Sequence, residues 1–388
     1  MTNEPGRLIA VLIFPLVFAL TAPALPAADA VPDSATIREK MRAANGPAPP
    51  VFRETDETVV SNGSTTIERD YVTASGRRYT FDTGRFHTER GVNGTDAWHM
   101  NDNGQVILDQ PDPGLATREQ MTTTVEAIHT PVEGYVIATL NVQKLGRKDY
   151  VDSATWRIVR REDISANGVA VTTYDDVRLD HGRMFAHHLH VDNGYAHTTS
   201  NLRVTEYAPG DVTAADVAVP NPRRALVEFP AGVSSVDLPV TFTRGHVDVR
   251  VMIGNRGLDL VLDSGASGIT IDSAVVRELG LPEFGKRSQV TAGRYTTART
   301  IVPEMRVGAL AMHDVAVQEI PQGWNAGNVK EVGRFVGYRV VGRGSYEGNV
   351  DGAIGPEFLQ LFTLGFDYGN SRIYLVPNRD GRLALGIR

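Results

Sequence analysis

The stretch Leu260-Val261-Leu262-Asp263-Ser264-Gly265-Ala266-Ser267-Gly268 decides the fold of the C-terminal half of this chain. Its three consecutive apolar residues predict a buried strand, and the Asp-Ser-Gly that follows predicts a tight turn that presents one carboxylate. Downstream, Asp351-Gly352-Ala353-Ile354-Gly355-Pro356-Glu357-Phe358-Leu359 combines an apolar pair, a glycine and a short helix-like run. A segment of that shape can pack beneath the turn, so we expect the two segments to form one site.

Asp263 is the candidate catalytic residue of this site. Amide hydrolysis needs an activated water and a proton donor, and two carboxylates about 3 Å apart supply both because they share one proton. Gly265 permits the turn and exposes backbone N–H groups that can hold the carboxylate, and Ser264 offers a hydroxyl to a second such turn. The tripeptide by itself is ordinary turn chemistry. The buried strand before it and the Ala353-Ile354-Gly355 segment after it make it a candidate active site.

The order of these segments resembles the retropepsin-like (retroviral-type) aspartic proteases of bacteria. The resemblance is carried by residues 246–253, Gly254-Asn255-Arg256-Gly257, the Asp263 turn, Ala353-Ile354-Gly355, and the strands expected at 364–368 and 372–375. It implies an all-β acid protease domain in which each chain supplies one Asp and a homodimer completes the site. It assigns turn and dyad support to Ser264, Gly265, Ala266, Ser267, Ile354 and Gly355. It also implies that residues 373–376 form the dimer edge.

A polar, Gly-containing segment at 288–300 lies where this family places its flap, the hairpin that closes over substrate. The residues expected in the flap are Thr291, Ala292, Gly293, Arg294 and Tyr295. A water-excluding lid suits such a segment, and a plain surface hairpin is the alternative. The Gly-rich segment 322–348 departs from the compact viral pattern and leaves substrate selectivity open.

Asp82-Thr83-Gly84 repeats the Asp-(Ser/Thr)-Gly pattern far upstream and raises a second reading, a two-lobed pepsin-like chain. Its surroundings disfavour that reading, because the preceding Tyr79-Thr80-Phe81 alternates in polarity and no apolar-apolar-Gly companion follows. We expect Asp82 to lie at a hairpin turn of the N-terminal half.

The N-terminal half reads as an antiparallel meander. A helix is expected from Asp33 or Ser34 to about Ala44, and a second one over residues 115–128, where Met121, Val125 and Ile128 have helical spacing. Asn-Gly and Ser-Gly dipeptides predict hairpins before residue 109, and further strands are expected at 134–140, 155–161, 169–177, 184–191 and 196–207. The texture of Gly91–Trp98, Tyr174–Arg178 and Ala215–Pro220 resembles the curved-sheet, lipoprotein-carrier-like domains of bacterial envelopes, which implies a lipid or lipoprotein ligand.

The fold class expected from these patterns is mainly β: a curved antiparallel sheet with a few helices, followed by the retropepsin-like domain. The expected division is a signal peptide at 1–30, a β-rich domain at 31–225, a linker at 226–236 and the protease domain at 237–388. Arg7, the apolar run 8–20 and Ala28-Asp29-Ala30 are typical of an export signal. We therefore expect a periplasmic or secreted protein, with an uncleaved membrane anchor as the alternative.

Composition narrows the function further. The formal net charge of −7 disfavours nucleic acid as a partner, and the absence of cysteine excludes disulfides and thiol chemistry. His188 and His190 could chelate a metal, but no carboxylate stands at a recognisable spacing. We expect an aspartic endopeptidase that hydrolyses a protein or peptide substrate without metal or cofactor. The alternative is a non-catalytic envelope protein that binds a lipid, an apolar peptide or a protein client.

Overall fold

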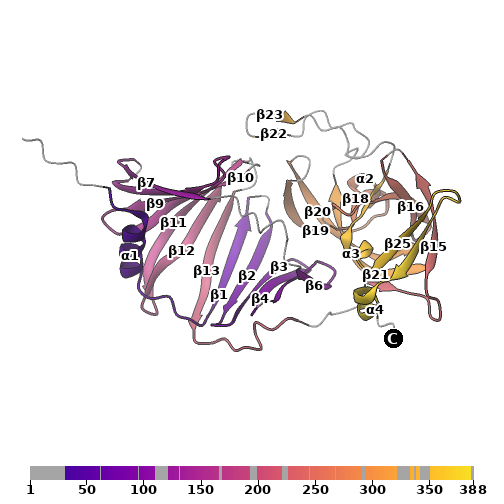
Figure 1. The fold of residues 1–388 in the computed structure, drawn as a ribbon, viewed down its shortest axis with the longest axis horizontal. Helices are drawn as coiled ribbons and strands as arrows, with labels where there is room; N and C mark the ends of the chain where they lie inside the picture. The colour runs from indigo at the N-terminus through magenta and orange to yellow at the C-terminus, as the bar shows by residue number, and fades with distance from the viewer. Residues whose placement is uncertain are drawn as a thin grey trace, which may run out of the picture.

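The computed structural model describes residues 31–388 except 62, 95, 110–120, 131, 166–167, 193–198, 221–225, 244, 267, 291–293, 321–332, 336–337, 341–349 and 386–388. Within these residues the chain forms two β units that lie side by side, a broad curved sheet and a compact barrel (Figure 1). This confirms the expected mainly β architecture. Among the described residues, no helix has the length and apolar character needed to cross a membrane.

The first unit is a 13-stranded sheet in the order β6-β5-β4-β3-β2-β1-β13-β12-β11-β10-β9-β8-β7. Its strands are β1 (Phe52–Val60), β2 (Thr65–Val72), β3 (Gly76–Thr83), β4 (Phe86–Asn93), β5 (Asp96–Met100), β6 (Val106–Asp109), β7 (Thr122–Ile128), β8 (Gly134–Leu140), β9 (Gly146–Asp152), β10 (Arg157–Ser165), β11 (Gly168–Asp180), β12 (Arg183–Asp192) and β13 (Ser200–Pro209). Nearly every neighbour in the sheet is a neighbour in sequence, as a chain punctuated by Asn-Gly turns predicts. The exception is β1, which pairs with β13 and joins the two halves of the meander.

Helix α1 (Ser34–Asn45) packs on one flank of this sheet, as Figure 1 shows. The Asp33 side chain caps it by accepting a hydrogen bond of 2.8 Å from the Thr36 amide. Ile37 is fully buried and lies in one apolar cluster with Ile137 and Val151. The expected helix α1 is therefore confirmed with its cap.

The helix expected over residues 115–128 is wrong in its described part. Residues 110–120 are outside the described residues, and Thr122–Ile128 forms strand β7, paired residue by residue with β8. The apolar spacing of Met121, Val125 and Ile128 matched a helix, but three consecutive threonines are β-branched and favour an extended backbone.

The second unit contains β14 (Val227–Glu228), β15 (Val236–Phe242), β16 (Val247–Ile253), β17 (Arg256–Leu262), β18 (Thr270–Asp272), α2 (Ser273–Glu278), β19 (Glu283–Val290), β20 (Arg294–Val307), β21 (Leu310–Ile320), β24 (Gly352–Ile354), α3 (Pro356–Leu359), β25 (Phe362–Asp367), β26 (Arg372–Pro377) and α4 (Arg379–Ala384). A small separate hairpin is formed by β22 (Gly333–Phe335) and β23 (Tyr338–Val340). The order β16-β17-β24-β18-β21-β20 closes into a barrel because β20 pairs back to β16. The helices α2, α3 and α4 are each six residues or shorter.

The barrel encloses one large apolar core. Its buried members include Leu258, Leu260, Met305, Ile354 and Phe358, all fully or almost fully shielded from solvent. Leu226 and Val227, which the sequence placed in the linker, belong to this same core, and β14 pairs with β21. Residues at the start of the expected linker therefore contribute to the second unit.

Candidate active site

Strand β17 carries Asp263 to the candidate site. Leu260 and Val261 are buried, and Leu260 lies in the barrel core. The Asp263 amide donates a 3.0 Å hydrogen bond to the Ile354 carbonyl, so the residue is fixed at the point where the strand ends. A carboxylate mounted in this way has little backbone freedom, which suits a group that must hold a reacting geometry.

The turn after β17 holds the carboxylate of Asp263 through its own backbone. The Gly265 amide donates a 2.8 Å hydrogen bond to Asp263 Oδ1, and the Ala266 amide donates a 3.2 Å bond to the Asp263 carbonyl. Ser264 and Gly265 are exposed to solvent, whereas Ala266 packs on the buried Val261 and Ala353. Ser267 lies outside the described residues. The turn therefore presents its first residues outward and is anchored by Ala266.

The segment Ala353-Ile354-Gly355 lies under this turn. Strand β24 pairs in parallel with β17, so that Leu260, Val261 and Leu262 face Gly352, Ala353 and Ile354. A Cβ on Gly355 would approach the backbone of Gly268, at 2.9 Å from its carbonyl carbon and 3.0 Å from its nitrogen. Only glycine allows this contact between α3 and the turn. The sequence prediction that Ile354 and Gly355 meet the turn agrees with this geometry.

The flap expected at Thr291–Tyr295 is described only in part. Thr291, Ala292 and Gly293 lie outside the described residues, and Arg294 and Tyr295 begin strand β20. Strand β20 pairs with β19 in an antiparallel hairpin whose last registered pair is Val290 with Arg294. A hairpin therefore stands where the flap is expected. The segment 322–348 is mostly outside the described residues, apart from β22 and β23.

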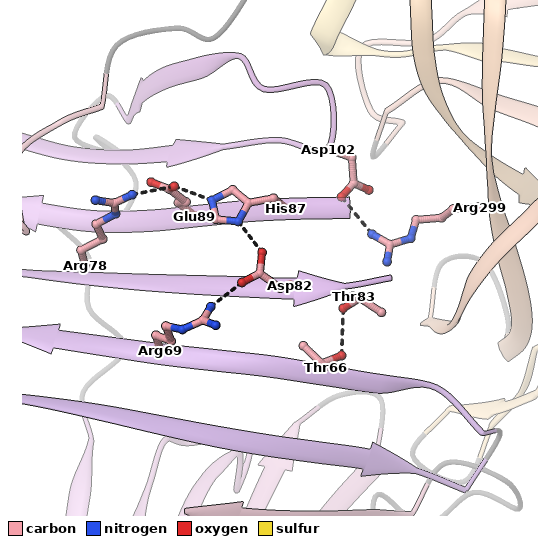
Figure 2. Close-up of polar contacts among 9 residues, drawn as sticks. All are labelled: Thr66, Arg69, Arg78, Asp82, Thr83, His87, Glu89, Asp102 and Arg299. Atoms are coloured by element: carbon pink, nitrogen blue, oxygen red, sulfur yellow. Dashed lines mark hydrogen bonds and ion pairs between the residues drawn. The ribbon is translucent and has the colours of Figure 1, made fainter. Parts of the chain in front are cut away.

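Asp82 lies at the end of β3 beside the β3–β4 turn, in surroundings unlike those of Asp263 (Figure 2). Its carboxylate accepts hydrogen bonds from Arg69 Nη1 at 2.5 Å and from His87 Nδ1 at 2.6 Å. Burial opposes ionisation, but the hydrogen bonds from His87 and Arg69 outweigh it and lower the pKa of Asp82. The expectation of a hairpin turn is confirmed, and this carboxylate is already engaged within the N-terminal sheet.

His87 links Asp82 to a second, deeply buried carboxylate. Its Nε2 hydrogen-bonds Glu89, which also accepts a 2.7 Å bond from Arg78 (Figure 2). Although burial opposes it, these two hydrogen bonds lower the pKa of Glu89 to about 2. The sequence analysis missed this network, since its members lie on three strands and only the i, i+2 spacing of His87 and Glu89 was visible.

His188 and His190, the pair weighed and disfavoured as metal ligands, each contact a single polar side chain across the sheet. His188 lies 3.7 Å from Asp175 and His190 lies 3.0 Å from the Asn201 side-chain oxygen. Within the described part of the chain, no three His, Asp or Glu side chains converge as metal ligands would.

The sequence analysis also missed Asn103, Gln105 and Glu357, which join the two units next to the candidate site. Asn103 and Gln105 lie in the β5–β6 turn and are buried against the barrel. Both bond Glu357 of α3, through its side chain and its carbonyl respectively. In the sequence, the only signal was the Asn103-Gly104 dipeptide of a hairpin turn.

Comparison with protein families matches residues 249–355 to the family model described as aspartyl protease. This range includes the Asp263 turn, the β19–β20 hairpin and the Ala353-Ile354-Gly355 segment. Residues 249–355 are therefore similar to the aspartyl protease family. Comparison with curated proteins found no match.

Solved structures similar to the chain fall into two groups. A retropepsin-like aspartic protease from Rickettsia conorii is 14% identical, with 36% of this chain and 87% of that chain covered and a TM-score of 0.23. A putative outer membrane lipoprotein-sorting protein domain from Vibrio parahaemolyticus is 11% identical, with coverages of 47% and 94% and a TM-score of 0.35. A LolA superfamily protein from Nitrosomonas europaea is 12% identical, with coverages of 47% and 96% and a TM-score of 0.34.

Proposed function

We propose that this protein is an aspartic endopeptidase whose catalytic dyad is formed by Asp263 of two chains. The observation that carries the proposal is the mounting of Asp263: a carboxylate at the end of a buried strand, held by the Gly265 amide and seated on Ile354 and Gly355. The family match over residues 249–355 supports it.

The chemistry follows from two such turns meeting. One Asp263 carboxylate is ionised and takes a proton from the attacking water, while the other is protonated and hydrogen-bonds the scissile carbonyl oxygen. Ser264, exposed on the turn, is placed to bond the partner turn. The reaction uses water and two carboxylates and needs no metal or organic cofactor.

The second carboxylate is expected from another chain because Asp82 is unsuited to the role. A dyad member must exchange a proton readily, whereas the Asp82 carboxylate is paired with Arg69 and His87 and its pKa is lowered. Within the described part of the chain, no buried apolar strand like β17 leads to Asp82 and no segment like β24 lies beneath it. The pepsin-like reading therefore has no support in the described residues.

The dimer surface differs from the one that the family resemblance implied. Residues 373–376 lie in β26, which pairs with β15 on one side and β25 on the other, so both of its sides are occupied within the chain. Strand β25 ends the described strand order instead. Phe366 and Tyr368 are 45% and 72% exposed beside this edge. An open strand edge with apolar side chains suits pairing with a second copy of the chain.

The β19–β20 hairpin is the proposed flap over the substrate, a protein or peptide in extended form. We place the enzyme in the periplasm or outside the cell, in keeping with the export-like sequence of residues 1–30. The N-terminal sheet then serves to bind an envelope client that the barrel cleaves.

A second candidate function, binding without catalysis, is favoured by a cavity of about 1050 Å³ beside α1. Three arginines line it together with one carboxylate and an apolar side chain: Arg38, Arg42, Arg183, Glu39 and Met41. Cationic and apolar groups in one cavity suit an anionic amphiphile such as a lipid. A lipid-binding chain that shows no Asp263-dependent cleavage would favour this second function.

The protease proposal is tested by incubating residues 31–388 with denatured casein over a range of pH. Asp263→Asn should lower the rate by about 10²-fold to 10⁴-fold, the usual contribution of a general acid–base group, with unchanged circular dichroism. Asp82→Asn is the matched control and should leave cleavage intact. Cleavage that survives Asp263→Asn would remove the protease function from this site, and loss of cleavage only in Asp82→Asn would revive the pepsin-like reading.

A further inference from the structure

The β5–β6 turn of the N-terminal sheet is built as a rigid tip. Asn101 Oδ1 accepts hydrogen bonds from the amides of Asn103 at 3.0 Å and Gln105 at 3.1 Å, and the Asn101 amide donates to the Gln105 carbonyl. These bonds fix residues 101–105 independently of any contact with the barrel. The turn is therefore prearranged to present its side chains to a partner surface.

Asn103 uses this tip to bond two elements of the barrel at once. Its Oδ1 accepts a 2.7 Å hydrogen bond from the Ala316 amide in β21, and its Nδ2 donates to the Ala316 carbonyl at 3.3 Å. The same Nδ2 also donates to Glu357 Oε2 of α3. Asn103 is only 2% exposed, so these bonds are shielded from water. Shielded hydrogen bonds are costly to lose because the groups left behind stay unpaired.

Glu357 connects this contact to the candidate catalytic turn. The Gln105 side chain donates a 3.0 Å hydrogen bond to the Glu357 carbonyl, so the N-terminal sheet holds both its main chain and its side chain. The Glu357 carboxylate lies against Gly268, where an added Cβ would come within 2.5 Å of Oε1. Gly268 ends the stretch that begins at Asp263. Glu357 therefore lies next to the end of the turn.

The same tip also reaches the strand that continues from the proposed flap. Asp102 Oδ1 accepts a 2.9 Å hydrogen bond from Arg299 Nη1 of β20, a side chain that is only 7% exposed (Figure 2). The Arg299 guanidinium also stacks over the Phe86 ring at 4.0 Å. Turn 101–105 thus contacts Glu357 of α3, which lies against the catalytic turn, and Arg299 of β20, the second strand of the proposed flap hairpin.

A second turn of the same sheet repeats the hydrogen bonding of this tip. In the β8–β9 turn, Asn141 Oδ1 accepts bonds of 2.9 Å from the amides of Gln143 and Leu145, and the Asn141 amide donates to the Leu145 carbonyl. The hydrogen bonding repeats that of Asn101, Asn103 and Gln105. Gln143 stands at the position of Asn103 but is exposed. Turn 141–145 is therefore a matched control for turn 101–105.

We propose that Asn103 is a positioning residue of the protease site, through which the N-terminal sheet holds the catalytic turn and the flap strand in their working arrangement. This inference rests on the proposed aspartic protease function. The N-terminal sheet is then an integral part of the enzyme, and not only a separate client-binding module. The proposal distinguishes Asn103 from Gln143, which has the same turn hydrogen bonding but an exposed side chain.

The charge state of Glu357 gives the role of Asn103 a test that depends on pH. Burial raises the pKa of Glu357 to about 7, while the hydrogen bond from Asn103 lowers it in part. The Glu357 carboxylate adjoins a cavity of about 240 Å³. The other charged or titratable residues that line this cavity are Asp102, which precedes Asn103 in the β5–β6 turn, and Glu89, Arg90 and His99. Asn103→Asp keeps an acceptor for the Ala316 amide but places a carboxyl against Glu357. The pair can bond only when it shares a proton, so this variant should recover as the pH falls.

The test compares the full chain with its Asn103→Ala, Asn103→Asp and Gln143→Ala variants. Amide hydrogen exchange at Ala316 reports docking without reference to activity, and steady-state casein cleavage reports the site. We expect Asn103→Ala to raise Ala316 exchange at least about tenfold, since a shielded hydrogen bond is lost, and to lower kcat more than it raises KM. Asn103→Asp should approach wild-type kcat at low pH and lose it on raising the pH. Gln143→Ala should match wild type in every measurement.

The possible failures are separable. Unchanged Ala316 exchange in Asn103→Ala would overturn the docking contact. Faster exchange with wild-type kcat and pH profile would overturn the positioning role while leaving the protease function standing. Slow Ala316 exchange in a wild-type chain without Asp263-dependent cleavage would overturn the proposed function and the positioning role with it, while the contact itself would stand.

Discussion

Gly355→Ala is the substitution that most sharply tests how the catalytic turn is supported. The added methyl would lie 2.9 Å from the carbonyl carbon of Gly268 and 3.0 Å from its nitrogen, whereas ordinary contacts begin at 3.4 Å. The difference of 0.5 Å (3.4 minus 2.9) is a lower bound on the displacement of α3 or the turn. The backbone angle of Gly355, φ −91°, suits any residue, so the effect comes from the close approach and not from backbone strain.

The expected cost has two parts. Overpacking of this kind destabilises by about 1–3 kcal/mol. A displacement of about 1 Å in a catalytic group lowers activity by about 10²-fold, so a shift of about half that size should lower kcat/KM roughly tenfold or more. Gly369→Ala is the matched control, because its methyl would meet only the Asp367 carboxylate, at an ordinary 3.6 Å.

The assay is casein cleavage alongside thermal unfolding of both variants. Gly355→Ala should lose activity at temperatures where the fold is intact, and Gly369→Ala should keep it. Wild-type kcat/KM in a folded Gly355→Ala chain would refute the reasoning, because the turn would then tolerate displacement.

Three further predictions concern stability. Ile354→Ala should lower the free energy of unfolding of the barrel by about 2–5 kcal/mol, because Ile354 is fully buried. Ile354→Val should lower it by only about 0.5–1.5 kcal/mol. Equal melting temperatures of the two variants would contradict this. Glu89→Gln should destabilise the N-terminal sheet by about 3 kcal/mol near neutral pH, since the pKa of Glu89 lies at about 2 against a usual 4.5 and its side chain is fully buried. A lowered carboxyl pKa stabilises the fold when the pH is above the usual pKa of 4.5, and this stabilisation is lost as the pH falls through 4.5 toward 2. In chemical denaturation, the difference in free energy of unfolding between Glu89→Gln and wild type should therefore shrink over that pH range. A difference that does not depend on pH would count against the network. Asp33→Ala should cost about 1 kcal/mol through loss of the α1 cap, visible as weaker amide protection of residues 34–37, and unchanged protection would show that the cap contributes nothing.

Much of the barrel was predictable because its signals are local. The apolar run Leu260-Val261-Leu262 predicts a buried strand, and Asp263-Ser264-Gly265 predicts the turn that follows it. The pairing of this strand with Ala353-Ile354-Gly355 is long-range, and it was reached through the family resemblance. In the N-terminal half, the strand expected at 134–140 has the bounds of β8, because β-branched runs between Gly and Asn residues define both ends.

The misses share a physical cause, which is that tertiary contacts decide them. Thr122–Ile128 has apolar spacing that suits a helix, and pairing with β8 makes it a strand. The dimer edge assigned to 373–376 failed because β15, from the start of the barrel domain, pairs with β26. Asn103 and Glu357 are 254 residues apart in sequence, and no periodicity or motif connects an Asn-Gly turn with a helix so distant.

The central claim is that one Asp263 per chain makes activity a property of the dimer. It is tested most directly by mixing wild-type and Asp263→Asn chains at equal amounts, allowing them to re-pair, and measuring cleavage at a fixed total concentration. If each dimer needs both carboxylates, random pairing leaves about one quarter of the wild-type activity. A residual activity of about one half would mean that each chain works by itself, and would contradict the shared dyad.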